Sequence, residues 1–302
     1  MEELRFIVEP DDAGTRIDKC IALKLGKGYS RTFVKFLIEK GLVRVGGRSV
    51  KPRYIAHQGD EVFLELPPPE IGGVDPEDIP LKIIYEDDWI IVVDKPAGMV
   101  VHPGAGNRKG TLVNALLFHC GNLPDTGNGL RPGLAHRLDK DTSGILVVAK
   151  NERALRSLAK QFQKRAVKKS YLTVVNGRVE MDNGVVDLPV ARHSLDRKKM
   201  SVEYARGKEA RTVYHVLRRF RKFTLLRVEP ETGRTHQIRV HMKHLGYPVV
   251  GDAKYGGSRD MERQALHAET LIFSHPHTGE RMEFTSSMPE DMRELLEKEK
   301  NK

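Results

Sequence analysis

The sequence predicts an α+β protein, with a small α+β unit near the N-terminus and a larger unit built on a mixed, largely antiparallel sheet. Residues 15–67 show the patterns of two short amphipathic helices, a hairpin and a strand. From about residue 80 the pattern changes to many strands with few helices between them. A doubly wound parallel sheet needs strands and helices in alternation, so this order favours a mixed or antiparallel sheet. A chain of 302 residues is long enough for both units.

Two helices are expected in the first unit. In residues 15–25 and again in residues 30–41, apolar side chains recur at the spacing of one helix face. Ser30 is the expected N-cap of the second helix, and Gly41 is its expected stop.

A hairpin and a strand complete this unit. Residues 42–52 alternate apolar and basic side chains around Gly46 and Gly47, which is typical of a tight turn. Residues 59–66 are expected to form the next strand. The three prolines of residues 67–69 cannot continue a helix or a sheet, and they predict a stiff linker.

The larger unit is expected to be rich in strands. Strand-like runs occupy residues 81–87, 89–96, 99–103, 144–150, 168–177, 211–219 and 223–230. Amphipathic helices are expected over residues 152–166 and 235–246, where apolar side chains follow the helical period.

Positive charge is grouped along the chain, whose net charge is +10. Residues 15–67 carry 11 Lys and Arg against 5 Asp and Glu, residues 150–170 carry 8 against 1, and residues 192–222 carry 11 against 3. Residues 67–100, in contrast, carry 2 against 8. Grouped cations favour a nucleic-acid partner, although a solvated face is the simpler interpretation of any single run.

The remaining composition favours a protein of the cytoplasm. Cys20 and Cys120 are far apart and form no CxxC pair, so a disulfide framework is not expected. The N-terminus has no basic segment followed by an apolar one, and no apolar run reaches the roughly 18 residues that a membrane span needs.

The segment HRLDKDTSG concentrates charge at the mouth of a strand. Its Arg137, Asp139 and Asp141 lie on a loop between Gly133 and Gly144, a place where catalytic side chains are commonly held. One aspartate, kept ionised by a nearby cation, could act as a nucleophile or a base. The structural alternative is a turn-forming pair that bonds locally with the hydroxyl residues that follow.

The segment ETGRTHQIRVH offers further cations. Arg234 lies where a strand meets a helix, and Arg239 and Lys243 are four apart on that helix and could grip phosphates. A metal site is not expected from the three histidines of this region, because they lack HExxH spacing, a carboxylate between them and a cysteine nearby. These are His236, His241 and His244.

Tyr171 follows two lysines on an expected strand. A half-buried core residue is the ordinary interpretation, and a platform for stacking a base is the functional one. The Gly/Pro-rich segment of residues 94–106 has neither P-loop nor GxGxxG spacing, so no nucleotide cofactor is expected.

Six segments in this order resemble the RluA-type pseudouridine synthases: KPAGMVVHPGAG, HRLDKDTSG, KKSYLTVV, GRTHQIRVH, GDAKYG and QALHAETLIFSHP. Residues 15–67 resemble the S4 RNA-binding module. The stretch PLKIIYEDDWIIVVDKPAGMVVHPGAG brings the chain nearest to the RluD branch, which acts on 23S ribosomal RNA. The resemblance implies a pseudouridine synthase fold with a central cleft, and the isomerisation of uridine without cofactor or metal.

The resemblance also implies roles for single residues. Asp139 matches the essential aspartate, which either attacks C1′ of the target nucleotide or removes the C2′ proton. Arg137 resembles the arginine that displaces the base from its stack. Tyr171 matches the tyrosine that packs on the uracil and is a candidate base for the last proton removal. Arg234 matches the cation paired with the aspartate.

The expected organisation is an S4-like domain over residues 15–67, a linker over 68–80 and a catalytic domain over 81–302. The S4-like domain would bind RNA through basic side chains of its second helix and hairpin, namely Arg31, Lys35, Arg44 and Arg48. The expected partner is 23S rRNA or a precursor of the large ribosomal subunit, with no membrane, and the protein is expected to be a monomer. Two alternatives are a non-catalytic S4-type RNA-binding or ribosome-assembly protein and a metal-dependent nucleic-acid hydrolase.

Overall fold

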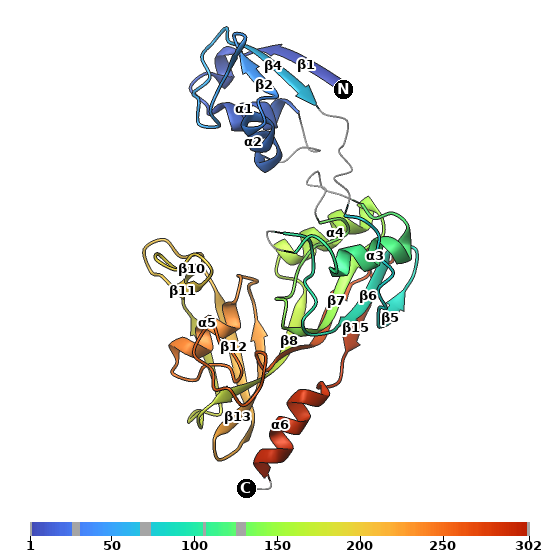
Figure 1. Ribbon diagram of the computed structural model, residues 1–302, viewed down its shortest axis with the longest axis vertical. Helices are drawn as coiled ribbons and strands as arrows, with labels where there is room; N and C mark the ends of the chain where they lie inside the picture. Colours follow the sequence, from blue (N-terminus) through green and yellow to red (C-terminus); the bar gives the residue numbers. More distant parts are fainter. Residues whose placement is uncertain (1, 26–30, 67–73, 105–106, 125–130, 301–302) are drawn as a thin grey trace.

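A four-stranded sheet and two helices form the N-terminal unit. The computed structural model describes residues 2–25, 31–66, 74–104, 107–124 and 131–300 (Figure 1). The elements of this unit are β1 (Glu2–Ile7), the 3-10 turn η1 (Pro10–Asp12), α1 (Ile17–Lys24), α2 (Arg31–Glu39), β2 (Val43–Val45), β3 (Arg48–Ser49) and β4 (Glu61–Leu66). The strands are antiparallel in the order β1-β4-β2-β3, and both helices pack on them around one apolar core.

The two helices and the hairpin expected in this unit are present. Gly46 and Gly47 have φ values of 53° and 75°, which suits a two-residue hairpin turn that needs positive φ at both positions. Strand β1 was not expected from the pattern, and it extends the sheet to residues before the predicted start at residue 15. The expected N-cap Ser30 and the prolines 67–69 lie outside the described residues.

The second unit is built on one large sheet. Its strands are β5 (Ile83–Glu86), β6 (Ile90–Lys95), β7 (Ser143–Ala149), β8 (Lys168–Asn176), β9 (Asn183–Asp187), β10 (Val190–Arg192), β11 (Met200–Val202), β12 (Arg211–Arg219), β13 (Phe223–Pro230), β14 (Leu266–Ser274) and β15 (Arg281–Thr285). Its helices are α3 (Leu112–Cys120), α4 (Glu152–Gln163), α5 (Gln237–His244) and α6 (Glu290–Lys300).

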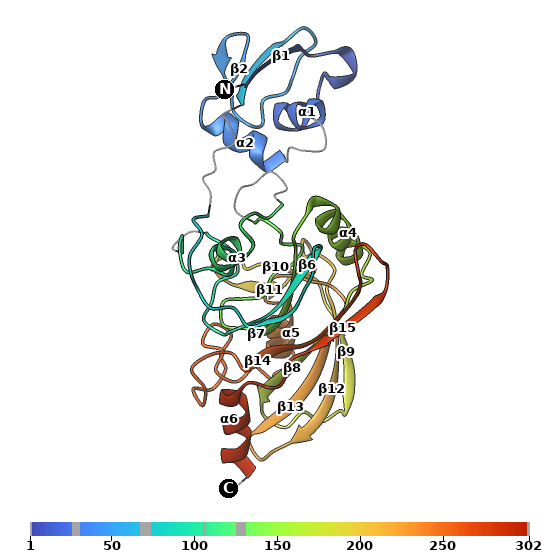
Figure 2. The ribbon, with the colours of Figure 1, turned by 90° about the vertical axis from the view of Figure 1, so that its right-hand side faces the viewer.

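The large sheet is mixed, as the sequence predicts. It has nine strands in the order β5-β6-β7-β14-β8-β13-β12-β9, with β15 paired to β14 (Figure 2). Among the described residues, β7 and β14 are the one parallel pair of neighbours and the other pairs are antiparallel. Strands β10 and β11 form a separate two-stranded hairpin.

Strands β6 and β7 are covered on both faces. Because successive side chains of a strand point to opposite faces, Ile145 and Val147 pack towards α4, whereas Leu146 and Val148 pack towards α3. Every residue of β7 is buried, which explains its continuous apolar sequence. The loop that enters β7 is therefore attached to a strand that is buried along its whole length.

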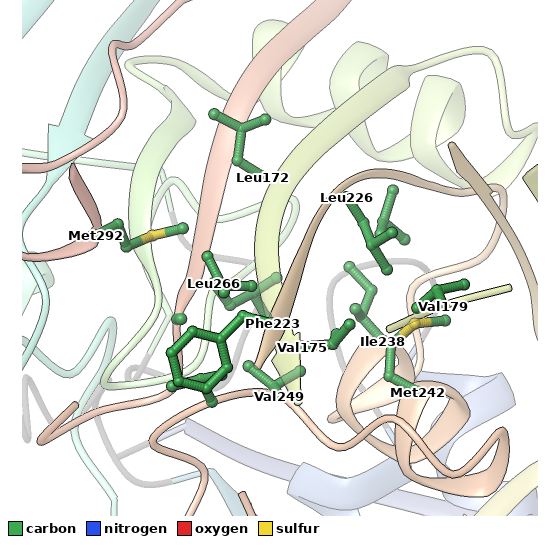
Figure 3. Packing of buried hydrophobic residues seen from close by; sticks show 14 of the residues in the cluster. Leu172, Val175, Val179, Phe223, Leu226, Ile238, Met242, Val249, Leu266 and Met292 are labelled. Atoms are coloured by element: carbon green, nitrogen blue, oxygen red, sulfur yellow. The ribbon is translucent and has the colours of Figure 1, made fainter. Parts of the chain in front are cut away.

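The other half of the sheet packs against α5. Figure 3 shows Leu226 of β13 near Ile238 and Met242 of α5, while Phe223 of the same strand lies beside Val249 and Leu266. Met292 of α6 joins the same core. This packing fixes α5, and with it the residues at its N-terminal end, against the sheet.

The segment 99–103 is not a strand, contrary to the prediction. The carbonyl oxygens of Val100 and Val101 accept hydrogen bonds from the amides of Leu112 and Val113, at 2.8 and 3.1 Å. The segment thus holds the first turn of α3, a helix that the sequence pattern did not reveal. Thr111 and Asn114 cap that helix reciprocally.

The described part of the predicted linker, residues 74–80, packs onto the second unit. The Asn114 side-chain amide donates to the Asp75 carbonyl at 2.7 Å, and the Glu77 amide donates to the Asn114 carbonyl at 3.0 Å. Val74 is buried. This end of the linker is therefore fastened to α3.

Both helices expected in the second unit are present as α4 and α5, with shorter bounds. The left-handed φ of Arg165, 58°, follows α4, and that of His236, 55°, precedes α5. In the part of the chain that the structure describes, no helix has the length and the apolar character needed to cross a bilayer.

Candidate active site

Two glycines hold the ends of the charged loop before β7. Gly133 has a φ of 71°, and a Cβ there would lie 2.6 Å from Val148 Cγ1. Gly144 has a φ of 113°, and a Cβ there would lie 2.2 Å from the carbonyl oxygen of Ala268 on β14. Positive φ and close backbone approach both require glycine at these positions. The loop is thus pressed tightly onto the sheet at both ends.

A buried lysine holds the loop through hydrogen bonds. Lys95, 1% exposed, donates through Nζ to the carbonyl oxygens of Pro96, Met99 and Lys140 at 2.7, 2.9 and 3.0 Å. Burial lowers the pKa of Lys95 to about 7. Three carbonyl acceptors match the three donors of an ammonium group, so Lys95 ties the loop to the end of β6.

The two aspartates of the loop have different surroundings. The turn closes with a hydrogen bond of 3.1 Å from the Thr142 amide to the Asp139 carbonyl. The Asp141 carbonyl accepts a hydrogen bond from Arg263 Nη1 at 3.2 Å. Asp139 lines the main cleft of the catalytic unit, whereas Asp141 is not among its lining residues. The backbone of Asp141 is used to fix the turn, and the side chain of Asp139 faces the cleft.

His136 anchors the start of the loop. Its Nε2 accepts a hydrogen bond from the Val147 amide at 3.1 Å, and its ring stacks on Phe162 of α4 with centroids 4.5 Å apart. Burial lowers the pKa of His136 to about 3, so the ring is neutral at physiological pH. The next residue, Arg137, is exposed at the cleft and lies 3.3 Å from His102, between Nη1 and Nε2.

Asp139 is paired with Arg239. Arg239 Nη1 donates to Asp139 Oδ2 at 2.8 Å, and the same guanidinium donates through Nε and Nη2 to both carboxylate oxygens of Asp252, at 2.6 and 2.8 Å. Burial of Arg239 opposes its charge, but the hydrogen bonds and charges of the two aspartates outweigh burial and raise its pKa. The guanidinium is therefore a permanent cation, held in place by Asp252, that faces the carboxylate of Asp139.

The expected ion pair between Asp139 and Arg234 is not formed. Arg234 lines the same cleft, but its Nε donates to the Glu209 carbonyl at 2.9 Å, and its amide donates to Gln237 Oε1 at 3.0 Å. Because α5 begins only at Gln237, Arg234 lies in the preceding turn, whereas Arg239 lies on the helix and reaches the loop before β7. Arg239, and not the predicted Arg234, is thus the cation that pairs with Asp139.

His236 and Tyr255 complete the surroundings of Asp139. His236 Nε2 lies 3.7 Å from Asp139 Oδ2, and its Nδ1 lies 2.7 Å from the Tyr255 hydroxyl. Burial lowers the pKa of His236 to about 4, so it is a neutral neighbour. The Tyr255 ring lies 5.0 Å from the Arg239 guanidinium carbon, within cation–π distance. The left-handed backbone of His236 is held by these contacts, which is common at functional sites.

Lys169 and Tyr171 reach the cleft from β8. They are two residues apart, so both side chains point to the same face of the strand. Lys169 Nζ donates to the Thr232 carbonyl at 3.2 Å, and burial lowers its pKa to about 8. Burial also raises the pKa of Tyr171, with a smaller contribution from Asp139, so its hydroxyl is protonated. That hydroxyl has no hydrogen-bond partner within the described ranges and is open to an incoming ligand.

These side chains share one cleft of about 630 Å³. It runs between the loop before β7, the end of α4, strand β8 and the turn that leads into α5. Of the site residues predicted from the sequence, it brings together Arg137, Asp139, Tyr171 and Arg234. The volume is within the range of sites for small molecules and single nucleotides.

The four basic residues predicted to bind RNA in the N-terminal unit differ in their contacts. Arg31 Nη2 donates to both carboxylate oxygens of the buried Asp18 at 3.2 Å, and Lys35 forms an ion pair with Glu39 at 3.4 Å. Arg44 and Arg48 are exposed on the hairpin, and their side chains have no partner among the residues that the structure describes. Arg31 therefore joins α2 to α1, and the hairpin arginines are the free cations of the four.

The histidines of α5 have protein partners. His241 Nδ1 lies 2.8 Å from Thr212 Oγ1, and its Nε2 lies 3.0 Å from the Leu188 carbonyl oxygen. Over the described ranges, three side chains with metal-ligand chemistry meet in one place outside the cleft, namely Glu86, His119 and Cys120. The Glu86 carboxylate there already binds Lys150 and His119, at 2.8 and 2.7 Å.

Sequence reasoning missed several residues of this site. It considered Arg239 as a phosphate ligand rather than the partner of Asp139, and it gave no role to Lys95, Asp252 or Tyr255. Asp252 and Tyr255 lie in the segment GDAKYG, which contributes to the resemblance but has no predicted role of its own. A buried arginine on a helix needs an acidic partner, and Asp252 was one of several acidic residues near it in the sequence without an assigned role.

Comparison with known proteins identifies the family of the chain. A model of the RNA pseudouridylate synthase family matches residues 89–244, and a model of the S4 domain matches residues 15–62. An uncharacterized RNA pseudouridine synthase of Bacillus subtilis, YlyB, is 46% identical over 299 residues, which cover 98% of each chain. Ribosomal large subunit pseudouridine synthase D of Pseudomonas aeruginosa is 47% identical over 298 residues, covering 94% of this chain and 91% of that protein.

A solved structure leads to the same conclusion. Human RNA pseudouridylate synthase domain containing 1 superposes with a TM-score of 0.57 at 26% identity, covering 78% of this chain and 98% of that one. The large mixed sheet thus has the fold of a known member of the RNA pseudouridylate synthase family. The chain belongs to the RNA pseudouridylate synthase family and is an RNA-modifying isomerase that carries an S4 domain ahead of its catalytic unit.

Proposed function

We propose that this enzyme converts uridines of 23S ribosomal RNA to pseudouridine, with Asp139 as the catalytic carboxylate. The observation that carries the proposal is the contact of 2.8 Å between Asp139 and the buried guanidinium of Arg239, in a cleft that also holds Tyr171. The choice of large-subunit RNA is supported by several relatives named ribosomal large subunit pseudouridine synthase D, which are 42–47% identical over nearly their full length. A ribosomal substrate also accords with a protein of the cytoplasm.

The proposed reaction needs no added atoms. The bond from C1′ to N1 of the target uridine breaks, the uracil turns, and C5 joins C1′. The proton on C5 is lost, and N1 ends with a proton. Asp139 either attacks C1′ or removes the C2′ proton, and both routes require its anion beside the sugar. Arg239 stabilises that anion and fixes its direction.

The target base must leave its stack before it can enter the cleft. Extruding a base costs a few kcal/mol, which contacts with the protein must offset. Tyr171 offers a ring in the cleft wall on which the uracil can stack, and Arg137 is exposed at the cleft, where it can occupy the space that the base leaves. The resemblance implies these roles, and the placement of both side chains at the cleft supports them.

The two loop aspartates provide the test of the catalytic assignment. Asp139→Asn keeps the shape of the side chain and removes the anion, so single-turnover pseudouridine formation should fall by at least about 10³-fold while RNA affinity stays within about threefold. Asp141→Asn is the matched control, and it should retain turnover because its backbone carbonyl, not its carboxylate, fixes the turn. The reverse result in the two variants would refute the assignment.

The substrate is tested separately in cells. Pseudouridines would be mapped in 23S rRNA from cells with and without the gene, and from cells that express Asp139→Asn. Loss of the same positions in the deletion and in the Asp139→Asn strain supports the proposal. An unchanged 23S rRNA map with losses in other RNAs would show a different substrate.

We also propose that the S4 unit adds affinity through its hairpin. Arg44 and Arg48 are exposed and unpaired among the described residues, so they can release counterions by contacting phosphates. Arg44→Ser/Arg48→Ser should lower the slope of log affinity against log salt by about 0.7–0.9 for each phosphate that the hairpin no longer neutralises. An unchanged slope would show that the hairpin does not contact this RNA. The alternative of a non-catalytic S4-type RNA-binding protein is disfavoured, because residues 89–244 match the pseudouridylate synthase family and hold Asp139 and Tyr171 in one cleft.

A further inference from the structure

A second cleft adjoins the active site and is lined by cations. Its volume is about 370 Å³, and Arg192, Arg206, Lys208 and Arg234 line it. No aspartate or glutamate is among its described lining residues. Gly233, Arg234 and Thr235 line both this cleft and the active-site cleft, so the two are continuous across this turn.

Backbone hydrogen bonds around the second cleft position these basic side chains. Val190 of β10 exchanges two backbone hydrogen bonds with Lys208, at 2.9 and 3.0 Å, which places Lys208 beside the β10–β11 hairpin. The Gly207 amide donates to the Glu203 carbonyl at 2.9 Å, and a Cβ on Gly207 would lie 2.3 Å from that same oxygen. Only glycine permits this close turn, which presents Arg206 and Lys208 on either side of it.

The cations of the second cleft are available for a ligand. Arg192 and Lys208 are exposed, and their side chains have no hydrogen-bond or ion-pair partner among the residues described. Arg206 has one weak contact, 3.8 Å from Nε to Glu203 Oε2. Arg234 uses its Nε for the Glu209 carbonyl, which leaves the outer nitrogens of its guanidinium without a partner in the described structure. Like charges repel one another, and the Glu203 contact offsets only part of this repulsion, so an anion is the ligand that these cations favour.

The hairpin wall of this cleft is also joined to the catalytic aspartate. The Met200 amide of β11 donates to the Tyr255 hydroxyl at 2.8 Å. The same hydroxyl lies 2.7 Å from His236 Nδ1, and His236 Nε2 lies 3.7 Å from Asp139. The hairpin that carries Arg192 is therefore held in place relative to Asp139.

We propose that the second cleft binds the phosphodiester backbone of the RNA next to the target uridine, through Arg192, Lys208 and Arg234. This inference rests on the proposed function, because it takes RNA as the substrate. With the target nucleotide in the active-site cleft, the adjoining chain leaves across the turn at Gly233 and meets these cations. The turn at Arg234 then separates the reacting nucleotide from its bound neighbour, a role that differs from pairing with Asp139.

The test compares variants of the full-length chain in binding to in vitro transcribed 23S rRNA at several salt concentrations. Arg192→Ser/Lys208→Ser should lower the slope of log affinity against log salt by about 1.4–1.8, since each phosphate contact contributes about 0.7–0.9. Between about 50 and 200 mM salt, the wild type should then lose about 7–12-fold more affinity than this variant. Both side chains are exposed and unpaired in the described structure, so unfolding curves should match those of the wild type.

Two controls keep the proposal falsifiable. Lys298→Ser/Lys300→Ser removes the same charge from α6, which lies apart from the β10–β11 hairpin in both views (Figures 1 and 2), and it should leave the slope unchanged. Arg192→Lys/Lys208→Arg keeps the charge and should keep the slope. An unchanged slope in Arg192→Ser/Lys208→Ser, or an equal fall in the α6 variant, would overturn the site.

The proposed substrate can fail independently of this site. Pseudouridine formed in the same transcript by the wild type tests the substrate, whereas the difference in slope between variants tests the cleft. A wild type that binds but forms no pseudouridine contradicts the proposed substrate. The slope difference still decides whether the second cleft contacts RNA.

Discussion

Arg239 joins Asp139 to Asp252, with one guanidinium nitrogen on the first carboxylate and two on the second. The side chain of Asp252 is fully buried, and that of Arg239 is 6% exposed. The triad therefore links the loop before β7 to α5 and to the segment after it. Arg239 has both a structural and a chemical task, and substitutions can separate the two.

Arg239→Lys should slow pseudouridine formation more than it weakens RNA binding. A lysine keeps the charge but cannot bind Asp252 through two nitrogens and still reach Asp139, so the carboxylate of Asp139 loses its fixed direction. The expected fall in single-turnover rate at saturating RNA is about 10²-fold or more. Arg239→Ala should in addition lower the free energy of unfolding by about 3–5 kcal/mol, because it leaves the buried Asp252 carboxylate with two backbone amides but without its cation. A folded Arg239→Ala protein with a normal single-turnover rate would contradict this role.

Tyr171 should contribute to binding through its ring and to chemistry through its hydroxyl. Tyr171→Phe keeps the ring and should bind RNA like the wild type, whereas Tyr171→Ala should lose about 1–3 kcal/mol of binding free energy. If the hydroxyl takes part in the last proton transfer, Tyr171→Phe should stall after the base has detached, which analysis of the RNA products would reveal. Equal affinity of Tyr171→Ala and the wild type would exclude stacking.

His136 should make the protein sensitive to acid. Its folded-state pKa of about 3 lies below the ordinary value of 6.5, so protonation in this window favours the unfolded chain. The free energy of unfolding should therefore fall as pH decreases from about 6.5 towards 3, by up to about 1.4 kcal/mol per pH unit from this residue.

His136→Phe provides the comparison, measured by chemical denaturation at several pH values. It should lose about 1–3 kcal/mol at about pH 7, because the Val147 amide loses its acceptor, and its stability should depend less on pH. A pH dependence identical to that of the wild type would show that His136 is not the titrating group.

Gly144→Ala should destabilise the protein more than Gly98→Ala. Both glycines have positive φ, 113° and 84°, which costs an alanine about 1–2 kcal/mol. A Cβ at Gly98 meets nothing within 4 Å, whereas one at Gly144 would lie 2.2 Å from the Ala268 oxygen. Urea denaturation of both variants measures the difference. Equal loss of unfolding free energy in the two variants would contradict this prediction, because it would mean that β7 and β14 move apart around the new Cβ without an energetic cost.

The sequence predicted those parts of the fold that depend on local patterns. The helices α1, α2, α4 and α5 and the Gly46-Gly47 hairpin were expected because their apolar spacing or turn residues are visible in a short window. Helix α3 was missed because LVNALLFHC is apolar around most of its circumference and shows no polar face. The segment before it was predicted as a strand because MVV is apolar and contains two β-branched valines. In the structure, its carbonyls accept hydrogen bonds from the first turn of α3.

The site was predicted to the level of the motif but not of every contact. Asp139 and Tyr171 were named and lie in one cleft. The choice between Arg234 and Arg239 depended on where α5 begins, and that boundary is set by the left-handed His236 and its contact with Tyr255. Lys95 was not considered because lysine is rarely buried, and its three carbonyl partners become visible only in the folded chain.

The parallel pairing of β7 with β14 has a consequence for the order in which the protein becomes active during its synthesis. β7 ends at Ala149, but its second neighbour begins only at Leu266, and Arg239 follows Asp139 by 100 residues. At about 5–20 residues per second, the ribosome needs on the order of 10 s to make the intervening chain. The S4 sheet, in contrast, is complete once β4 ends at Leu66. A nascent chain therefore has the elements of its RNA-binding module well before it has those of a working catalytic centre.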